Sequence, residues 1–409
     1  MCNRRLPRVL FGRSVARVQR SATNNRPRVV HISTAHPWED NRILQRECRA
    51  LSQSGYRVEL IAGTEVEREV YGVHIHPVPP ERGRFRRITR GVPRALLIAR
   101  GRRADVYHLH DPELIPLAPL LRRSGASVIF DAHEDLPNQV LDKHYLPRPT
   151  RKAAAAFAKA LYWFAGYSCH QVIAATNTVA NRFPSHRTTV VRNYPQLRQD
   201  VEGEYADTTA NGLRRNLLVY VGEISVDRGI YEMLAAMKYM PESWRLTLAG
   251  PVHPPTLLDS LRREAAWGRV DYYGHVSPGE ARNLVARSRI GIVVLHPTRA
   301  YVDALPTKLL EYMAEGIPVV ASDFPYWRGI VEEESCGLLV DPLDPKVIGE
   351  AMSGLAAEQA RAEEMGANGR RAIVEEFNWG REKIRLLTMY RSLTGFDDIC
   401  GDDDEVEHD

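Results

Sequence analysis

The sequence DALPTKLLEYMAEGIPVVASD, residues 303–323, predicts a short helix that leads into a buried strand. Pro306 suits the first helical turn, because the N–H that proline lacks is unpaired there anyway. Gly316 suits the C-terminal cap, and Pro318 prevents the helix from continuing. The stretch therefore predicts a helix over about residues 306–315 and a strand directly after it.

This predicted helix places charges where they can meet a phosphorylated ligand. Its N-terminus presents free backbone N–H groups, which bind anions. Lys308 adds a positive charge in the first turn, and Glu311 one turn later can accept hydrogen bonds from two adjacent hydroxyls, such as those of a ribose. Asp303 lies just before the helix, within reach of a sugar hydroxyl. The plain alternative is that Lys308 and Glu311 form a solvated helix pair at three-residue spacing.

Short apolar strands alternate with helical stretches on both sides of a polar segment, which predicts two parallel sheets covered on both faces. We therefore expect an α/β fold with two Rossmann-like, doubly wound domains facing a cleft, where ligands lie beyond the carboxyl ends of the strands. The predicted strands are residues 27–34, 56–63, 106–110, 127–133, 171–176 and 188–193, then 216–222, 244–251, 269–275, 289–296, 317–322 and 336–341.

The length of 409 residues suits two domains. The five cysteines are scattered without paired or metal-ligand spacing, so we expect a reducing compartment and no structural zinc. No apolar run reaches the roughly 18 to 20 residues that span a bilayer. The nearest run, residues 153–167, carries Lys159 and suits a buried or surface-docking helix.

Charge is distributed unevenly along the chain. Residues 1–26 hold seven arginines and no acid, which suits a flexible extension, although a transit peptide has similar composition. Residues 82–103 hold nine arginines and no acid, with apolar residues between them. This cluster suits an anionic membrane surface or a lipid diphosphate acceptor, or else it is a solvated loop. It lacks the interleaved aromatic platforms of nucleic-acid binding, which we therefore do not expect. The last thirteen residues, 397–409, hold eight acids and no base.

Residues 303–323 resemble the signature of retaining GT-B glycosyltransferases of family 4, in which a first acid, seven residues and a glutamate precede a strand like PVVAS. The resemblance implies that Glu311 holds the nucleotide ribose and that Asp303 contacts the donor sugar. The first acid is usually glutamate, so Asp303 departs from the pattern. Lys308 and Leu309 fall on the donor side of the same motif.

A second motif, VYVGEISVDRGIYEML from Val219, resembles the family segment that binds the donor diphosphate through two basic residues. Gly222 matches, Glu223 stands where the first base is expected, and Arg228 matches the second base. Arginine grips phosphate as a fork, and Lys308 can supply the missing charge. The alternative is that Arg228 is only a surface residue at a helix start.

Turns after two further strands resemble those that border the nucleotide base, and they place Gly250 (LAGP) and His275 (YYGHVS) on the donor side. FDAHEDLP places His133 where the family has a histidine against the donor sugar. Glu134, in the same segment, and His110, in HLHDPE, are candidates for acceptor or loop-ordering roles, whereas His108 is expected in the core.

The first strand is followed by AHPWEDNRIL, where many family members have a glycine-rich loop. Asp40 and Arg42 are therefore candidates for organising the acceptor side. The alternative is a helix N-terminal cap with an ion pair.

The resemblance covers about residues 28–394 and defines the expected organisation. It implies an N-terminal acceptor-side domain, a C-terminal nucleotide-sugar domain, and a last helix that crosses back to the first domain. The expected segments are a basic extension at 1–26, the first domain at 27–195, a linker at 196–215, the second domain at 216–376, the crossing helix at 377–394 and an acidic tail at 395–409.

The implied activity is transfer of a hexose-type sugar from a nucleotide diphosphate donor, UDP favoured, to an acceptor hydroxyl with retention, in glycoconjugate, polysaccharide or glycosylated-metabolite biosynthesis. We expect no cofactor and no metal, because basic residues replace a divalent ion, and a cytoplasmic protein with peripheral contact to the inner membrane face through residues 82–103. Two rivals stay open, a nucleotide-sugar 2-epimerase and a non-catalytic partner subunit.

Overall fold

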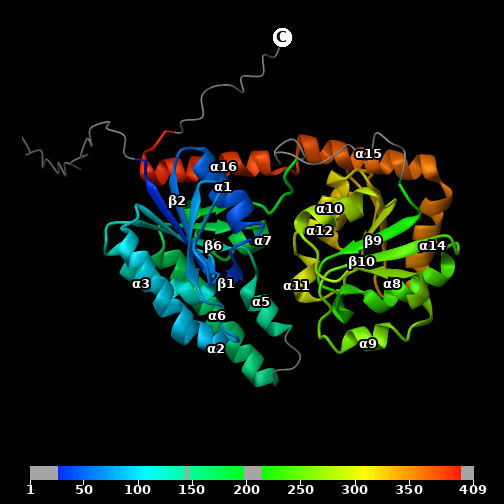
Figure 1. Cartoon of the computed structure of the whole chain (residues 1–409), viewed down its shortest axis with the longest axis horizontal. Helices are drawn as coiled ribbons and strands as arrows, with labels where there is room; N and C mark the ends of the chain where they lie inside the picture. Colours follow the sequence, from blue (N-terminus) through cyan, green and yellow to red (C-terminus); the bar gives the residue numbers. More distant parts are fainter. Residues whose placement is uncertain (1–25, 143–146, 198–213, 398–409) are drawn as a thin grey trace, which may run out of the picture.

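The structure is a computed structural model, and it describes residues 26–142, 147–197 and 214–397. Two α/β domains lie side by side, the N-terminal one blue to green and the C-terminal one green to orange in Figure 1. The prediction of two doubly wound domains is confirmed. Most of the basic extension, of the linker and of the acidic tail expected from the sequence lies outside the described residues.

The N-terminal sheet has the order β3-β4-β2-β1-β5-β6-β7-β8. All neighbouring strands run parallel except β3 and β4, which the sequence patterns did not predict. The strands are β1 (Arg28–Pro37), β2 (Arg57–Gly63), β3 (Arg68–Val70), β4 (Val73–Val78), β5 (Val106–Leu109), β6 (Ser127–Ala132), β7 (Gln171–Ala174) and β8 (Thr188–Val190).

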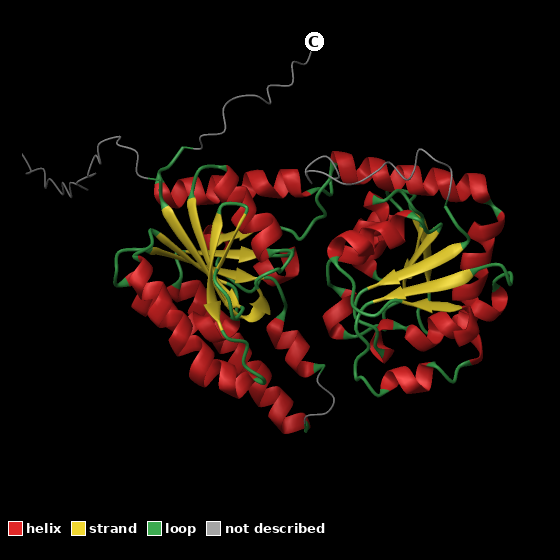
Figure 2. Cartoon of the chain, viewed as in Figure 1, coloured by secondary structure: helices red, strands yellow, loops and turns green. Residues whose placement is uncertain are grey.

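Helices cover both faces of this sheet (Figure 2). One face packs against α1 (Arg49–Gln53), its preceding turn η1 (Ile43–Cys48) and the last helix α16 (Trp379–Thr394). The other packs against α3 (Val92–Arg102), η3 (Pro112–Leu117), α4 (Ala118–Arg122) and α6 (Arg148–Ser168). The remaining helical segments are α2 (Arg84–Arg86), η2 (Arg87–Gly91), α5 (Leu136–Leu141), α7 (Asn177–Ala180) and η4 (Ser185–Arg187).

The C-terminal sheet is parallel, in the order β11-β10-β9-β12-β13-β14. Its strands are β9 (Leu217–Val221), β10 (Arg245–Ala249), β11 (Val270–Tyr272), β12 (Ile290–Val293), β13 (Val319–Ser322) and β14 (Gly337–Val340). Its helices are η6 (Val226–Arg228), α8 (Ile230–Ala236), η7 (Met237–Tyr239), α9 (Leu257–Leu261), η8 (Ala265–Arg269), α10 (Pro278–Ala286), α11 (Arg299–Val302), α12 (Thr307–Ala314), α13 (Pro325–Val331), α14 (Pro345–Ala357) and α15 (Gln359–Glu375).

The last helix, α16, belongs by packing to the first domain (Figure 1). Tyr390 is fully buried there, and its hydroxyl lies 2.9 Å from Nδ1 of His108. The carboxylate of Glu382 accepts a hydrogen bond from the backbone N–H of Arg192. Because these polar groups are buried, each needs a partner, and the partners hold α16 in one position.

The crossing of α15 over α12 depends on a glycine. A Cβ atom on Gly366 would lie 2.3 Å from the carbonyl oxygen of Gly316, which caps α12 with φ of +66°. Two helix backbones can approach this closely only where no side chain intervenes. This crossing fixes the C-terminal end of α12, the helix predicted from residues 306–315.

Gly366→Ala is expected to lower the free energy of unfolding by about 1 to 3 kcal/mol, since the added methyl group overpacks a backbone contact. Gly354→Ala is the matched control, because Gly354 lies in α14 and a Cβ there meets nothing within 4 Å. The control should stabilise the protein by up to about 1 kcal/mol. Urea unfolding measures both, and equal effects of the two variants would contradict the assigned crossing.

Candidate functional site

Two cavities lie between the domains. Cavity A, of about 720 Å³, is lined by residues of α5, α11, the start of α12 and the loops after β6 and β7. Cavity B, of about 630 Å³, is lined by residues that follow β1, β9, β10 and β11, and by the middle of α12. Cavity A contains the predicted residues His133, Glu134, Arg228, Asp303 and Lys308, and cavity B contains Asp40, Gly222, Gly250, His275 and Glu311.

The two cavities meet where Lys308 lies over Gly222. A Cβ on residue 222 would lie 2.3 Å from Cε and 2.9 Å from Nζ of the lysine. Gly222 also has φ of +131°, a conformation that residues with a side chain rarely adopt. Glycine is therefore required at the end of β9 for Lys308 to reach the junction of the cavities.

The ammonium of Lys308 is a partly buried positive charge. Burial, together with repulsion from Arg228, lowers the pKa of Lys308 to about 8. Its Nζ lies 5.7 Å from the centre of the Tyr220 ring, which offers a cation–π contact. Across the described ranges, no carboxylate lies within ion-pair distance of this ammonium. An anion bound at the junction of the cavities would therefore interact with a positive charge that no carboxylate neutralises and that water solvates only in part.

Arg228 supplies a second cation to the same junction. Its Nε lies 3.5 Å from the carboxylate of Glu223, and its guanidinium lies 5.6 Å from the centre of the Tyr301 ring. Although burial opposes the charge, Tyr220, Tyr301 and Glu223 raise the pKa of Arg228. The guanidinium stays charged, but Glu223, which replaces the expected base, offsets part of its field.

The strand ends beside Lys308 form a backbone surface without side chains. Gly250 at the end of β10 has φ of +142°, and a Cβ there would lie 1.9 Å from the carbonyl oxygen of Gly222. On the other side, Tyr312 of α12 accepts a hydrogen bond through its hydroxyl from the backbone N–H of Val221. This bond ties α12 to β9, so that Lys308 and Glu311 face the cleft from a fixed helix.

His133 faces the cleft from the N-terminal domain, directly after β6. Its Nδ1 lies 4.0 Å from the carboxylate of Asp131, and its ring packs edge-on against His36 at 5.0 Å. Although burial opposes protonation, the hydrogen bond to Asp40 and the charges of Asp111 and Asp40 raise the pKa of His36 to about 9. The N-terminal wall of cavity A is therefore backed by a charged imidazolium.

Arg42 does not contact the cleft, which differs from the acceptor-side role expected from sequence. Its guanidinium is buried and donates two hydrogen bonds to Asp131, at 2.7 and 2.9 Å, and one to the carbonyl oxygen of Val191. Glu47 forms a further ion pair with it at 3.2 Å. Asp40 instead accepts hydrogen bonds from the backbone N–H groups of Arg42 and Ile43. Asp40 therefore caps the start of a helical segment, as in the alternative interpretation. Its ion pair is with His36 rather than with Arg42.

Two other candidates also lie away from the cleft. His110 is fully buried, because its ring is held between His31 and Asp131 at 2.8 and 3.3 Å rather than turned outward from the strand end. Leu309 is fully buried in the core of the C-terminal domain, since it lies on the face of α12 opposite the cavities. His108 lies in the core as expected.

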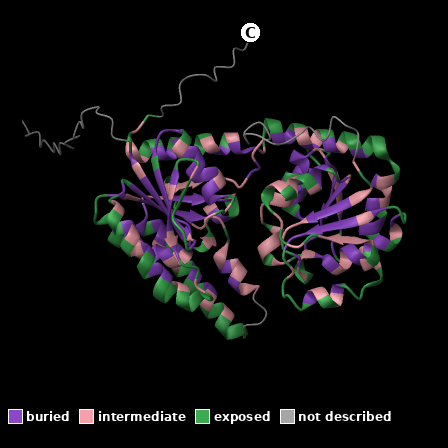
Figure 3. Cartoon of the chain, in the orientation of Figure 1, coloured by how far each residue is buried: buried purple, intermediate pink, exposed green. Residues whose placement is uncertain are grey.

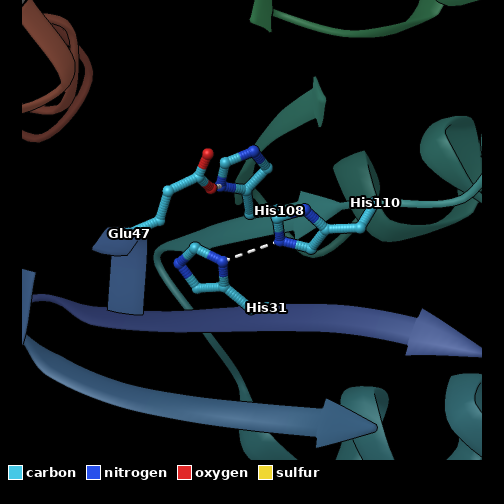
Figure 4. Close-up of side chains that lie close together, drawn as sticks. All are labelled: His31, Glu47, His108 and His110. Atoms are coloured by element: carbon cyan, nitrogen blue, oxygen red, sulfur yellow. Dashed lines mark hydrogen bonds and ion pairs between the residues drawn. The ribbon is translucent and has the colours of Figure 1, made fainter. Parts of the chain in front are cut away.

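Four buried residues lie close enough together to hold a metal ion, namely His31, Glu47, His108 and His110 (Figure 4). Five of the six ring nitrogens have partners, since His31 bonds His110 and Tyr390, His110 faces Asp131, and His108 contacts Tyr390 through Nδ1. Nε2 of His108 and the carboxylate oxygens of Glu47 have no hydrogen-bond partner among the described residues, although Glu47 forms an ion pair with Arg42. Burial also lowers the pKa of His31 and of His108, which keeps both rings neutral. We interpret the group as a hydrogen-bond network between the first sheet and α16. A second, partly exposed group consists of Glu67, His74 and His76.

Several cleft residues were not predicted from sequence. Arg46 reaches cavity B from η1, and burial lowers its pKa to about 10, while Glu311 opposes that shift from across the cleft. Tyr301 and Trp327 line cavity A. The only sequence signal for Arg46 is its position one turn after Arg42, which does not distinguish it from a surface residue. At the edge of cavity A, the backbone N–H of Ala300 donates to the carboxylate of Asp142 at 2.7 Å, which joins the domains.

Comparison with known families identifies both halves of the chain. The model for glycosyl transferases group 1 matches residues 204–372, and the model for glycosyltransferase family 4 matches residues 41–193. A D-inositol 3-phosphate glycosyltransferase of Xylanimonas cellulosilytica is 28% identical over 180 residues, which is 44% of this chain and 42% of that protein. The chain thus spans less than half the length of this relative in the alignment.

Solved structures share the fold. Sucrose-phosphate synthase from Thermosynechococcus elongatus superposes with a TM-score of 0.73 at 20% identity, covering 90% of this chain and all of that chain. HepE from Anabaena, solved in complex with UDP-glucose, superposes with a TM-score of 0.66 at 12% identity over the same fractions. These likenesses show the two-domain GT-B architecture.

Arg42→Met is expected to lower the free energy of unfolding by roughly 3 to 5 kcal/mol, since it leaves Asp131 and Glu47 buried without their cation. The control is Arg361→Met, which removes an exposed ion pair with Glu358 and should cost at most about 1 kcal/mol. Urea unfolding followed by tryptophan fluorescence measures both. A loss for Arg42→Met no larger than that of the control would show that the guanidinium is not structural.

Proposed function

The chain belongs to the group 1 and family 4 glycosyltransferases, and from this membership we propose that it transfers a hexose-type sugar from a nucleotide diphosphate sugar to an acceptor hydroxyl. UDP is the favoured nucleotide, because HepE, one of the proteins that share the fold, was solved with UDP-glucose. The observation that carries the proposal is the partly buried cation of Lys308, which has a lowered pKa and lies at the junction of two cavities.

The proposed donor spans that junction. Its nucleoside lies in cavity B, where Glu311 accepts the ribose hydroxyls and Gly250 and His275 border the base. Its diphosphate lies over Gly222, against Lys308, Arg228 and the first-turn N–H groups of α12. Its sugar lies in cavity A between Asp303 and His133. The positions of Lys308 and Gly222 support this placement, because Lys308 lines cavity A and Gly222, beneath it, lines cavity B.

In the proposed reaction the bond between the sugar's anomeric carbon and the diphosphate oxygen breaks, and the acceptor oxygen forms the new bond. The acceptor hydroxyl loses its proton, and the nucleoside diphosphate leaves with the bonding electrons. Lys308, Arg228 and the α12 amides meet the charge that develops on the leaving oxygen, which is the main electrostatic demand of the step. No step requires a divalent ion, and family membership implies retention of the anomeric configuration.

The acceptor enters cavity A from the N-terminal domain. Glu134 and Gln139 line this side, and the bond between Asp142 and Ala300 closes its edge. Closure excludes water and limits hydrolysis of the donor. No helix among the residues described in the structure is long and apolar enough to cross a membrane. We propose a cytoplasmic enzyme of glycoconjugate, polysaccharide or metabolite biosynthesis with a peripheral membrane contact.

One observation favours a second candidate, a non-catalytic partner subunit. Glu223 pairs with Arg228 and offsets part of the charge that the diphosphate needs. Such a subunit would form no product from any nucleotide sugar, whereas a 2-epimerase would convert the donor without acceptor.

Lys308→Ala and Arg228→Ala are each expected to lower kcat/KM roughly 100-fold or more, because each removes a preorganised cation from the leaving group. Lys346→Ala is the control, since Lys346 is exposed and forms a surface ion pair with Glu350, away from both cavities. The donor is first identified by thermal shift against UDP, GDP and dTDP sugars, since a ligand that binds the native state raises Tm. Near-normal rates for both cleft variants would overturn the assignment.

The affinity for UDP-glucose is expected to fall as pH rises above 8. The pKa of Lys308 is about 8 in the free protein and rises when the diphosphate binds, so binding is strongest below the free pKa. Between pH 7 and pH 9 the Kd should increase about tenfold. Above the pKa of the free protein, Kd rises about tenfold for each pH unit until the pKa of the complex is reached.

Lys308→Arg is the matched control for this titration, because guanidinium does not titrate in the range. This variant keeps His36, whose pKa is about 9, and so reports any contribution from that ring. Isothermal titration calorimetry across the pH range measures both proteins. The same slope in the wild type and in Lys308→Arg would assign the titration to another group.

A further inference from the structure

The most exposed large apolar side chains in the described part of the chain all lie on helices of the N-terminal domain. Among the described residues, the five large apolar side chains with the greatest exposure are 69–79% exposed, and all lie in α2, α3 or α6. They are Phe85, Leu97, Phe157, Trp163 and Tyr167. We call them and the basic residues around them the arginine–aromatic face.

Helices α3 and α6 share one side of the first sheet, and α2 leads through η2 directly into α3. The inner residues Ala95 of α3 and Tyr162 and Ala165 of α6 are buried in a single core cluster with η3 and α4. The opposite side of the sheet is covered by α1 and α16. The outer sides of α3 and α6 therefore face the same way, and both are exposed in Figure 3, on the side of the domain away from α16.

The face is strongly basic. Residues 82–103, 118–123 and 148–168 hold fifteen arginines and lysines and no acid. Three of the nine arginines in the first stretch pair with acids, Arg87 with Glu113, Arg94 with Glu81 and Arg102 with Glu59. The other six, which are Arg82, Arg84, Arg86, Arg90, Arg100 and Arg103, have no carboxylate within ion-pair distance in the described part of the chain.

We propose that the arginine–aromatic face docks on an anionic phospholipid bilayer. A bilayer surface offers negative headgroups beside an apolar layer, which matches arginines interspersed with exposed phenylalanine, leucine and tryptophan. Tryptophan and tyrosine favour the headgroup region because their rings carry both an apolar body and a polar group. The helices lie on the surface rather than span it, since none described is apolar and long enough to cross.

The geometry disfavours nucleic acid as the partner. Base stacking needs free aromatic ring faces, and Trp163 and Tyr167 each use one face to stack on the other, with centroids 5.6 Å apart. Residues 82–103 hold a single aromatic residue, Phe85, among their nine arginines, and the aromatic pair of α6 lies on a separate helix rather than along one groove with them. A flat bilayer can meet both helices at once.

The face lies beside the mouth of cavity A. Helix α6 packs along α5, and Gln139 of α5 lines the cavity. If the protein has the proposed function, docking through this face brings the acceptor side of the cleft to the membrane, where a lipid-linked acceptor hydroxyl could enter. This step rests on the proposed function. Docking itself requires neither donor nor acceptor.

The full chain is sedimented with vesicles of phosphatidylcholine alone or with phosphatidylglycerol at about one third of the lipid. We expect at least about tenfold tighter binding to the anionic vesicles, because each surface arginine contributes attraction to a negative leaflet. Arg86→Gln/Arg90→Gln and Trp163→Ala/Tyr167→Ala should each lose about tenfold in affinity for anionic vesicles. The thermal midpoint of each variant shows that it is folded, since all four side chains are exposed.

Two controls match these variants in exposure but lie elsewhere. Ile384→Ser removes an exposed apolar side chain of α16, and Arg361→Gln removes an exposed arginine of α15. Equal binding to both vesicle types, or equal losses in controls and face variants, would overturn the proposal. Tighter binding to a single-stranded RNA, or to an acidic polypeptide, that depends on the same four residues would also overturn it. Because no donor is present, failure here leaves the proposed transferase activity intact.

Discussion

The side chain of Lys308 lies across the backbone of Gly222, and the geometry of the cleft depends on this contact. A side chain at position 222 would occupy the space of the lysine stem, so the cation reaches the junction of the cavities only over glycine. Two further glycines hold the helix that carries the lysine. A Cβ on Gly291 would lie 2.3 Å from the Tyr312 ring, and one on Gly366 would meet the C-terminal cap of α12. The position of the charge is thus set by small residues in three separate elements, each of which lets α12 lie closer to a neighbour than side chains allow.

The N-terminal wall of the cleft is fixed differently, by charges buried beneath it. Arg42 binds Asp131 and Glu47, and the histidine network extends from Asp131 to Tyr390 of α16. Breaking such a network leaves uncompensated buried charge, so its members are held in one arrangement. Since α16 follows α15 of the other domain, the same network fixes where the second domain is tethered. His133 faces the cleft at the edge of this rigid layer.

Most of the fold was predictable because buried parallel strands are short apolar runs, and all twelve predicted strands are present. Strands β3 and β4 were missed, since β3 has only three residues and β4 contains two histidines. Residues that directly follow a strand in the sequence were predicted to lie near the cleft. The sequence did not show which of their side chains line the cleft and which are buried beneath it. His110 and His133 both follow strands, yet His110 is bound by His31 and Asp131. That difference depends on residues 79 and 21 positions away in the chain, which no local pattern contains.

Positive charges lie in two different environments in this protein, the cleft between the domains and the exposed arginine–aromatic face. In the cleft, Lys308 and Arg228 are largely removed from water, so one anion interacts strongly with few charges and is screened little by salt. On the arginine–aromatic face the arginines are exposed, each attraction is weak, and binding must come from their number and from apolar burial beside them. Ionic strength therefore separates the two functions. Salt near 1 M, with a Debye length of about 3 Å, should weaken surface docking far more than donor binding. Substitutions in the cleft and on the arginine–aromatic face can therefore change donor binding and surface docking independently, although both sites lie in one chain.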